Sequence, residues 1–333
     1  MAETSASEQL AAAVGASDSK IIPAIFEALT DENEARLLLA AAPPATVAEL
    51  SEKTGMEAEE IEKMIDPLFR KGLLFKSKKP DAIRYYRPRH LLQLHDATGV
   101  SVDIPQKVLD LWKEHTRTEW IDYVKKIEKT LPRPVLRVIP VDVSVEPSSQ
   151  VLAFEDLKEL VDEAKNLAVT RCSCRAIDGD CGLSIDVCIQ VDKAADYAIE
   201  RGSGQKLTKQ ETMELLKKCA EEGLVHVADN RRSLGLVICN CCGDCCINWT
   251  SLKYGSNKFA APSRFRASVD AEECNSCELC LDRCYFEALS MDGDSGLAVI
   301  DHENCMGCGL CQVICPTDAV SMELVRPEEF VPA

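Results

Sequence analysis

Residues 274–284 read CNSCELCLDRC and residues 305–316 read CMGCGLCQVICP. Both stretches place four cysteines in the spacing C-x2-C-x2-C-x3-C, and the chain has 18 cysteines in all. The similarity extends to their surroundings, because Val269-Asp270 and Ile300-Asp301 precede the runs and an Ala-aliphatic-Ser-Met segment follows each of them. The two stretches are therefore an internal repeat, and each copy predicts a strand, a cysteine loop, a short helix and a second strand.

The spacing of the cysteines fits a cubane iron–sulfur cluster. Three thiolates two residues apart can wrap one face of the cube from a local turn, and the fourth ligand comes from elsewhere. The runs resemble those of bacterial two-cluster ferredoxins over roughly residues 262–333. This resemblance implies one-electron transfer through two [4Fe–4S] clusters, with the fourth cysteine of each run bound to the other run's cluster. The implied ligands are Cys274, Cys277, Cys280 and Cys315 for cluster 1, and Cys305, Cys308, Cys311 and Cys284 for cluster 2.

One residue departs from the ferredoxin pattern. Tyr285 stands where that family usually has proline after the fourth cysteine, whereas the second run is followed by Pro316. The change is expected to affect the access of solvent to a cluster without removing a ligand. Disulfides or a zinc knuckle are the alternatives for these eight cysteines, but zinc sites rarely have this triple C-x2-C rhythm.

The chain is acidic, and most strongly so at its C-terminal end. Its 333 residues carry a net charge of −17, and residues 271–333 contain 13 Asp and Glu but only two basic residues, Arg283 and Arg326. Such a surface repels nucleic acid and favours redox partners with a basic docking face. A hydrophobic content of 46% is enough for well-packed cores in two or three domains.

The sequence predicts a cytoplasmic protein. No stretch approaches 18 apolar residues, so no membrane span is expected. The first 20 residues lack the basic start and apolar core of a secretory signal, and we interpret residues 1–24 as a flexible tail. Many cysteines without a signal favour metal sites in a reducing compartment over disulfides.

Residues 25–92 resemble the winged helix-turn-helix of bacterial regulators. Thr46 and Glu49 form a capping-box pattern, and Thr54-Gly55 predicts a turn between two helices. Lys78 to Asp81 would form the wing. The predicted helices and strands are Ala24–Ala41, a helix from Thr46 to Lys53, Glu57–Lys71, and the strands Leu73–Lys76 and Ile83–Tyr86.

The charges of residues 21–90 indicate whether this region would bind DNA or protein. The start of the helix that would read DNA is acidic, and acid there opposes phosphate binding. The wing carries a basic strip, yet residues 21–90 contain 12 acidic and 11 basic residues. We therefore favour docking to protein over contact with DNA, the alternative. The acidic residues are Glu57, Glu59, Glu60 and Glu62, and the basic strip is Lys76, Lys78, Lys79, Arg84, Arg87 and Arg89.

The middle region, residues 93–261, mixes helices and strands. Residues 93–134 are predicted to be helical, and Val135–Val145 to be rich in strand. Thr208 and Glu211 make a capping box for a helix from Lys209 to Gly223. The other predicted elements are the helix Phe154–Lys165 and the strands Leu167–Thr170 and Leu224–Val227.

Nine middle cysteines fall into two dense groups, more than core packing requires. In extended chain, Cys172 and Cys174 would face one side, as would Cys239 and Cys241. A helix starting near Cys242 would place Cys242, Cys245 and Cys246 on one face. We expect at least one further iron–sulfur cluster here, flanked by Arg171 and Arg175; zinc or free thiols are the alternatives. The nine are Cys172, Cys174, Cys181, Cys188, Cys239, Cys241, Cys242, Cys245 and Cys246.

The order of these parts resembles cysteine-rich iron–sulfur proteins of anaerobic bacteria that end in a ferredoxin module. It predicts an α+β multidomain protein with a winged helix at 25–92, a cysteine-rich α/β domain at 93–261 and a two-cluster domain at 262–333. Outside the cysteine groups, Cys219 is expected to be a buried thiol. His226 is expected to be a hydrogen-bonded strand residue rather than a metal ligand.

Three functions are compatible with the sequence. The leading hypothesis is an electron carrier, or the redox subunit of a larger oxidoreductase. A reductase with a catalytic cluster in the middle domain and a redox-responsive regulator are the alternatives. Gly202 and Gly204 are not part of a dinucleotide-binding fingerprint, and no His/Asp/Ser arrangement stands out. No catalytic residue is therefore predicted, and an electron-transfer component is favoured over a stand-alone enzyme.

Overall fold

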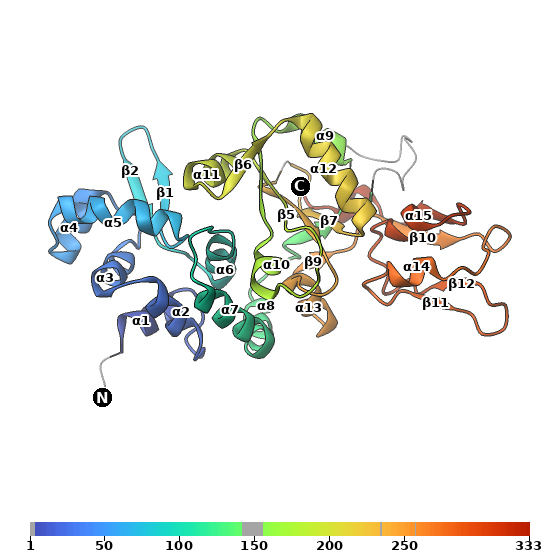
Figure 1. Cartoon of the computed structure of the whole chain (residues 1–333), viewed down its shortest axis with the longest axis horizontal. Helices are drawn as coiled ribbons and strands as arrows, with labels where there is room; N and C mark the ends of the chain where they lie inside the picture. Colours follow the sequence, from blue (N-terminus) through green and yellow to red (C-terminus); the bar gives the residue numbers. More distant parts are fainter. Residues whose placement is uncertain (1–3, 142–155, 234, 257) are drawn as a thin grey trace. The chain divides into compact units, whose positions relative to one another are not determined.

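The computed structural model describes residues 4–141, 156–233, 235–256 and 258–333 (Figure 1). The chain divides into two compact units that interleave along the sequence. The first comprises residues 1–126, 171–179 and 200–203, and the second comprises residues 127–170, 180–199 and 204–333. The predicted mixture of helices and strands is confirmed, with a helical N-terminal region and a central mixed sheet. The predicted domain boundaries at residues 24, 92 and 261 stay predictions.

The N-terminal segment is helical from residue 6, which corrects the prediction of a flexible tail. Helix α1 (Ala6–Ala13) begins at a capping box in which Ser5 and Glu8 satisfy each other's backbone amides. Leu10 and Ala11 are buried, and α1 packs against α2 (Ile22–Leu29). Alanine is a strong helix former, and the Ser5-x-x-Glu8 pattern is a helix cap, so the local sequence favours a helix over a flexible tail.

The helix predicted at Ala24–Ala41 is two helices. Helix α2 ends at Leu29, where Thr30 adopts an extended conformation, and α3 (Glu32–Ala40) starts one residue after its cap, Asp31. The Asp31 side chain accepts a hydrogen bond from the Glu34 amide at 2.8 Å, and Glu34 returns one to the Asp31 amide. A local cap therefore interrupts an apolar pattern that otherwise continues.

Two further helices and a hairpin complete the predicted pattern. Helix α4 (Val47–Thr54) has the expected capping box, and Gly55 ends it with a φ of 72°. Helix α5 spans Ala58–Arg70, and strands β1 (Phe75–Lys78) and β2 (Ile83–Tyr86) form an antiparallel hairpin. Strand β1 starts two residues later than predicted, because the Leu73 and Leu74 amides both bind the Leu68 carbonyl at the end of α5.

Four helices fill the rest of the first unit. They are α6 (Leu91–Gly99), α7 (Gln106–Thr118), the start of α8 (Trp120–Glu128), and α10 (Ser173–Asp178). Trp112 and Trp120 are fully buried, and the Trp112 indole donates a hydrogen bond to Thr98 Oγ1 at 2.9 Å. Helix α10 packs against both α6 and α7.

A seven-stranded sheet forms the centre of the second unit, in the order β6-β4-β5-β8-β7-β3-β9. It is mixed, since β3 pairs in parallel with β9 but antiparallel with β7. Of the predicted strand Val135–Val145, residues 136–138 form β3, and residues 142–145 lie outside the described part. The strands are β3 (Leu136–Val138), β4 (Leu167–Arg171), β5 (Asp186–Val191), β6 (Gly204–Leu207), β7 (Val225–Asp229), β8 (Val237–Cys241) and β9 (Ala260–Ala261).

The sheet separates two apolar cores. Ile238 faces the core beneath α9 (Leu157–Glu163) and α12 (Lys209–Glu222), where Leu160 and Leu216 are buried. Cys239 and Cys241, on the opposite face of β8, contact the core that contains Trp249 of α13 (Ile247–Lys253). Helix α11 spans Lys193–Arg201. The cap and end predicted for α12 are confirmed, whereas residues 154–155 of the helix predicted at Phe154–Lys165 are not described.

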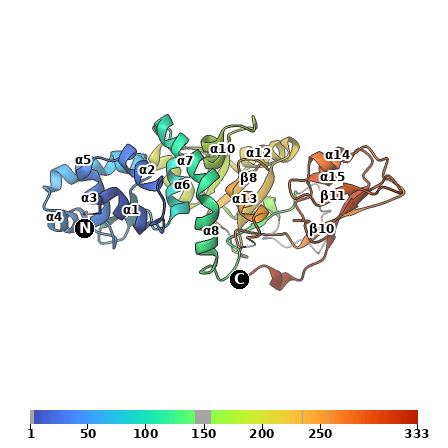
Figure 2. The same cartoon turned by 90° about the horizontal axis from the view of Figure 1, so that it is seen from below.

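The repeat folds as predicted, because each copy forms a strand, a cysteine loop, a short helix and a second strand; α14, α15, β10 and β11 are labelled in Figure 2. Strand β10 (Phe265–Val269) pairs with β13 (Val320–Leu324), and β11 (Leu289–Met291) pairs with β12 (Ala298–Ile300). The short helices are α14 (Leu279–Asp282) and α15 (Leu310–Ile314), and a 3-10 turn spans Glu328–Phe330. The Asp270 and Asp301 carbonyls accept hydrogen bonds of 3.1 Å from the amides of Cys274 and Cys305, so both runs begin identically.

No helix among the described residues is long and apolar enough to cross a membrane.

Candidate metal centres

The first cysteine cavity combines residues from both runs. It has an empty volume of about 340 Å³, and its lining includes Cys274, Cys277, Cys280 and Cys315. The first two lie on the loop after β10, Cys280 lies in α14, and Cys315 follows α15. These are the four residues that the ferredoxin resemblance implies for cluster 1, and Cys277 is exposed to solvent.

The second cavity has the complementary set. Its empty volume is about 350 Å³, and Cys284, Cys305, Cys308 and Cys311 are among its lining residues. Each cavity is therefore lined by three cysteines of one run and the last cysteine of the other. A cubane held by four thiolates fits this donor set.

The backbone of the two cysteine loops repeats as well. Gly307 and Gly309 have φ values of 66° and 81°, and the equivalent positions in the first run, Ser276 and Glu278, have 58° and 62°. A Cβ at Gly307 would stand 2.1 Å from the Phe265 carbonyl oxygen, so only glycine fits there. The first run adopts the same turn with side chains that rarely occupy this region.

Burial opposes ionisation of several thiols in these cavities. It raises the pKa of Cys308 to about 12 and lifts the pKa of Cys280 and Cys311 above the ordinary value. Burial acts in the same direction on Cys315, but hydrogen bonds, chiefly from Thr317, outweigh it and lower the pKa of that thiol. An iron–sulfur cluster would favour the thiolate form throughout, because metals bind deprotonated cysteine.

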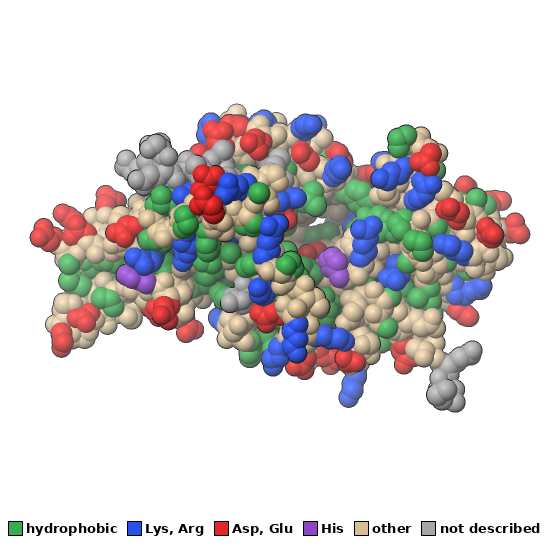
Figure 3. All heavy atoms as spheres, turned by 180° about the vertical axis from the view of Figure 1, so that it is seen from behind, with side chains coloured by type: hydrophobic (Ala, Val, Ile, Leu, Met, Phe, Trp, Pro, Cys, Tyr) green, Lys and Arg blue, Asp and Glu red, His purple; other side chains and the backbone are tan. Residues whose placement is uncertain are grey.

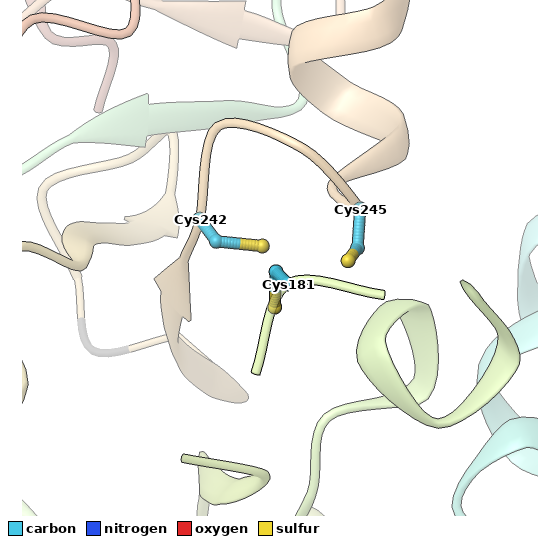
Figure 4. A group of neighbouring side chains, drawn as sticks. All are labelled: Cys181, Cys242 and Cys245. Atoms are coloured by element: carbon cyan, nitrogen blue, oxygen red, sulfur yellow. The ribbon is translucent and has the colours of Figure 1, made fainter. Parts of the chain in front are cut away.

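Three middle cysteines converge, and we call them the thiol trio: Cys181, Cys242 and Cys245 (Figure 4). Their Sγ atoms all lie within 4.8 Å of one another. Cys181 lies on the loop between α10 and β5, Cys242 follows β8 directly, and Cys245 belongs to the turn before α13. The hydrogen bond with Cys242, and then burial, raise the pKa of Cys245 well above its ordinary value; burial also raises the pKa of Cys181.

The helix predicted to start near Cys242 is wrong. Helix α13 begins at Ile247, with Cys246 as its capping residue, so Cys242 and Cys245 meet across a turn rather than along a helix face. Cys246 instead contacts Cys241, whose thiol shares hydrogen bonds with those of Cys239 and Cys246. The expectation that Cys239 and Cys241 face one side is confirmed, since both contact the same core.

The remaining middle cysteines are divided between the two units. In the second unit, the Sγ atoms of Cys188 and Cys239 are 4.0 Å apart on strands β5 and β8. In the first unit, Cys172 caps α10 and Cys174 lies in its first turn, so the prediction that both sit in extended chain is wrong. Their hydrogen bond, and then burial, raise the pKa of Cys172 well above its ordinary value. Whether these cysteines bind a further iron–sulfur cluster stays a prediction.

The two arginines expected beside these cysteines differ in their contacts. Arg175 is buried, and its charge acts to lower the pKa of Cys172. Arg171 binds backbone oxygens, donating to the Gly99 carbonyl at 2.9 Å and to that of Ser101. Arg175 therefore partly offsets thiolate charge, whereas Arg171 also fixes the end of α6.

Both residues outside the cysteine groups are placed as expected. Cys219 is buried in α12. His226 is buried on β7, with its Nδ1 atom 2.6 Å from Asn240 Oδ1, and burial lowers its pKa to about 4. A neutral, hydrogen-bonded imidazole needs no metal to satisfy it.

Comparison with known proteins identifies one part of the chain. Residues 267–322 match the model of the 4Fe-4S dicluster domain family. No curated protein and no solved structure gives a significant match. The chain therefore contains an iron–sulfur dicluster domain, a class of domain consistent with electron transfer in general.

Proposed function

We propose that this protein transfers single electrons through two [4Fe–4S] clusters in its C-terminal domain. Cys274, Cys277, Cys280 and Cys315 would hold one cluster, and Cys284, Cys305, Cys308 and Cys311 the other. The observation that carries the proposal is the composition of the two cavities, each with three cysteines of one run and one of the other. Each cluster would be oxidised or reduced by one electron, and the polypeptide supplies thiolates, hydrogen bonds and partial exclusion of water.

The surface around the first cavity supports a basic redox partner. Cys277 is exposed, and acidic side chains gather over this end of the second unit, at the left of Figure 3. Negative charge beside an exposed ligand would steer a positively charged partner toward the cluster. The exposed acidic residues include Glu272, Glu273, Glu278, Asp282, Asp294, Asp301 and Glu303.

Electron transfer to a basic acceptor is expected to slow as salt is added. The reduced protein would be mixed with a basic cytochrome c in stopped flow at increasing ionic strength, where screening weakens steering. The double variant Glu273→Gln/Glu278→Gln, next to Cys274 and Cys277, should lower the second-order rate several-fold at low salt. The control Glu59→Gln/Glu60→Gln removes equal charge from α5. A rate that ignores salt, or an equal loss in the control, would contradict docking at this face.

We also propose that the helices α3 to α5 and the β1–β2 hairpin form a winged-helix domain that docks to protein. An isolated bridge between Ala45 and Tyr85 adds a third strand position to the hairpin, as a winged helix requires. The four glutamates at the start of α5 are exposed. Much of the basic strip is already paired: Lys76 and Lys78 bind Glu200 at 2.9 and 2.8 Å, and Arg84 binds Asp81. Glu200 and Asp81 offset two of the strip's six positive charges, which weakens its attraction for phosphate.

DNA binding is expected to be no stronger than the non-specific level at physiological salt, with the clusters oxidised or reduced. Fluorescence anisotropy with duplexes of mixed sequence would measure it. Glu200→Ala provides the sharper comparison, because it releases Lys76 and Lys78 and should raise weak, salt-sensitive binding. Tight, sequence-selective binding by the unaltered protein that changes with cluster oxidation would instead establish the regulator.

A further inference from the structure

We infer that the thiol trio binds a single thiophilic divalent ion of the zinc class, not a [4Fe–4S] cluster. The trio is Cys181, Cys242 and Cys245, whose Sγ atoms lie within 4.8 Å of one another. The site is separate from the two cysteine cavities of the dicluster domain, and it does not depend on the function proposed for them.

The distance between the sulfur atoms favours one ion. A tetrahedral zinc with Zn–S bonds of about 2.3 Å holds its thiolates about 3.8 Å apart. A cubane places several iron atoms between its thiolates and so keeps them farther from one another. Three sulfurs within 4.8 Å therefore match a shared ion, and only small side-chain adjustments would complete the coordination.

The same chain contains the contrasting arrangement. Two sets of four cysteines line the two cavities of the dicluster domain. Within the described ranges, the trio is the one group of three His, Cys, Asp or Glu donors that meets the 4.8 Å separation, and neither dicluster set does. The fold thus spaces cysteines widely where a cluster is implied and closely at the trio.

The chain around the trio also has the form of a zinc site. Cys242 and Cys245 are a C-x2-C pair on a turn between a strand and a helix, and both are buried. Cys181 arrives from a separate loop and is half-buried, so solvent approaches from its side. Three thiolates leave the fourth tetrahedral position to a ligand from outside the trio.

The ion would fix the loop that supports the second cysteine cavity. Gly243, between the two buried ligands, lies against the ring of Tyr285, since a Cβ there would be 2.4 Å from Tyr285 Cδ1. Tyr285 directly follows Cys284, which lines the second cavity. An ion that links Cys181 to the Cys242–Cys245 turn would therefore fix the position of Gly243, against which Tyr285 of the dicluster domain packs.

Metal analysis of the full-length protein tests the inference. Protein purified anaerobically from medium containing both iron and zinc should hold about one zinc per chain, bound at about 2.3 Å to sulfur by X-ray absorption at the zinc edge. Cys245→Ala should reduce zinc from about one equivalent to nearly none, while the iron content stays at about eight atoms per chain. Cys219→Ala, which removes a buried thiol outside the cysteine groups, should change neither metal.

Each other outcome overturns the inference. A total of about twelve iron atoms per chain that falls to about eight with Cys245→Ala would show a cluster at the trio. Zinc that remains in Cys245→Ala would belong to another site. Should the variant fail to fold, the unaltered protein still decides, because absence of zinc–sulfur coordination in its absorption spectrum contradicts the site directly.

Discussion

Cys284→Ala and Cys305→Ala are each expected to remove the same cluster. Each variant should lose about four of the dicluster domain's roughly eight iron atoms, and the double variant should lose no more. The reason is that both residues line the second cavity although they belong to different runs. Cys284→Ala combined with Cys274→Ala should instead remove both clusters, because Cys274 lines the first cavity.

Iron and sulfide per chain, together with EPR of the dithionite-reduced protein, would distinguish these patterns. Cys219→Ala controls for the loss of a buried thiol, and it should retain all iron. If each run held its own cluster, the pair Cys274 and Cys284 would behave as one site and lose about four iron atoms together. That result would contradict the exchange of the fourth ligand, while leaving a two-cluster protein. Unaltered protein without iron would contradict the proposed function itself.

The dicluster domain was predictable because its metal ligands are cysteines at a characteristic spacing within two short stretches of sequence. Cys274 and Cys305 begin loops that the Asp270 and Asp301 carbonyls anchor in the same way, so one repeat predicted the other. The structure adds that Cys284 and Cys315 line opposite cavities from their own runs. The resemblance had implied this exchange, which spacing alone does not specify.

The thiol trio was not predictable in the same way. Cys181 is distant from Cys242 in the sequence, and the sheet order rather than any local pattern brings their loops together. The helix expected at Cys242 ignored Gly243, which the packed Tyr285 ring requires to lack a side chain. The N-terminal helix was missed for a different reason: the absence of a secretory signal does not distinguish a tail from a helix, whereas the Ser5–Glu8 capping box predicts a helix.

The contact between Gly243 and Tyr285 joins the cysteine turn of the central sheet to the dicluster domain. It belongs to a continuous core in which Trp249 and Phe286 meet edge to face at 5.0 Å, beside Met306 and Leu310 of the second run. The Val141 amide also donates a hydrogen bond to the Cys308 carbonyl at 3.1 Å. Disturbing this contact should therefore affect both the stability of the second unit and the second cluster.

Gly243→Ala is expected to destabilise the protein by about 1–3 kcal/mol, as overpacking of a filled core does. The new methyl group would be 2.4 Å from Tyr285 Cδ1 and 2.8 Å from Cγ, so the ring itself has to move. Thermal unfolding under anaerobic conditions would show a lower midpoint, and the EPR signal of the cluster bound by Cys284 should change. Adding Tyr285→Ala to Gly243→Ala removes the clash. The loss of unfolding free energy in the double variant should therefore be smaller than the sum of the losses in the two single variants.

Gly293→Ala is the matched control, because a Cβ there meets nothing within 4 Å. It should leave both the unfolding midpoint and the cluster signals nearly unchanged. If Gly243→Ala behaved like this control, or if the two substitutions at Gly243 and Tyr285 were simply additive, the ring would not be in contact with the turn. The dicluster domain would then be independent of the cysteine turn. Metal bound at the thiol trio would in that case not stabilise the loop at Cys284 and Tyr285, which lines the second cavity.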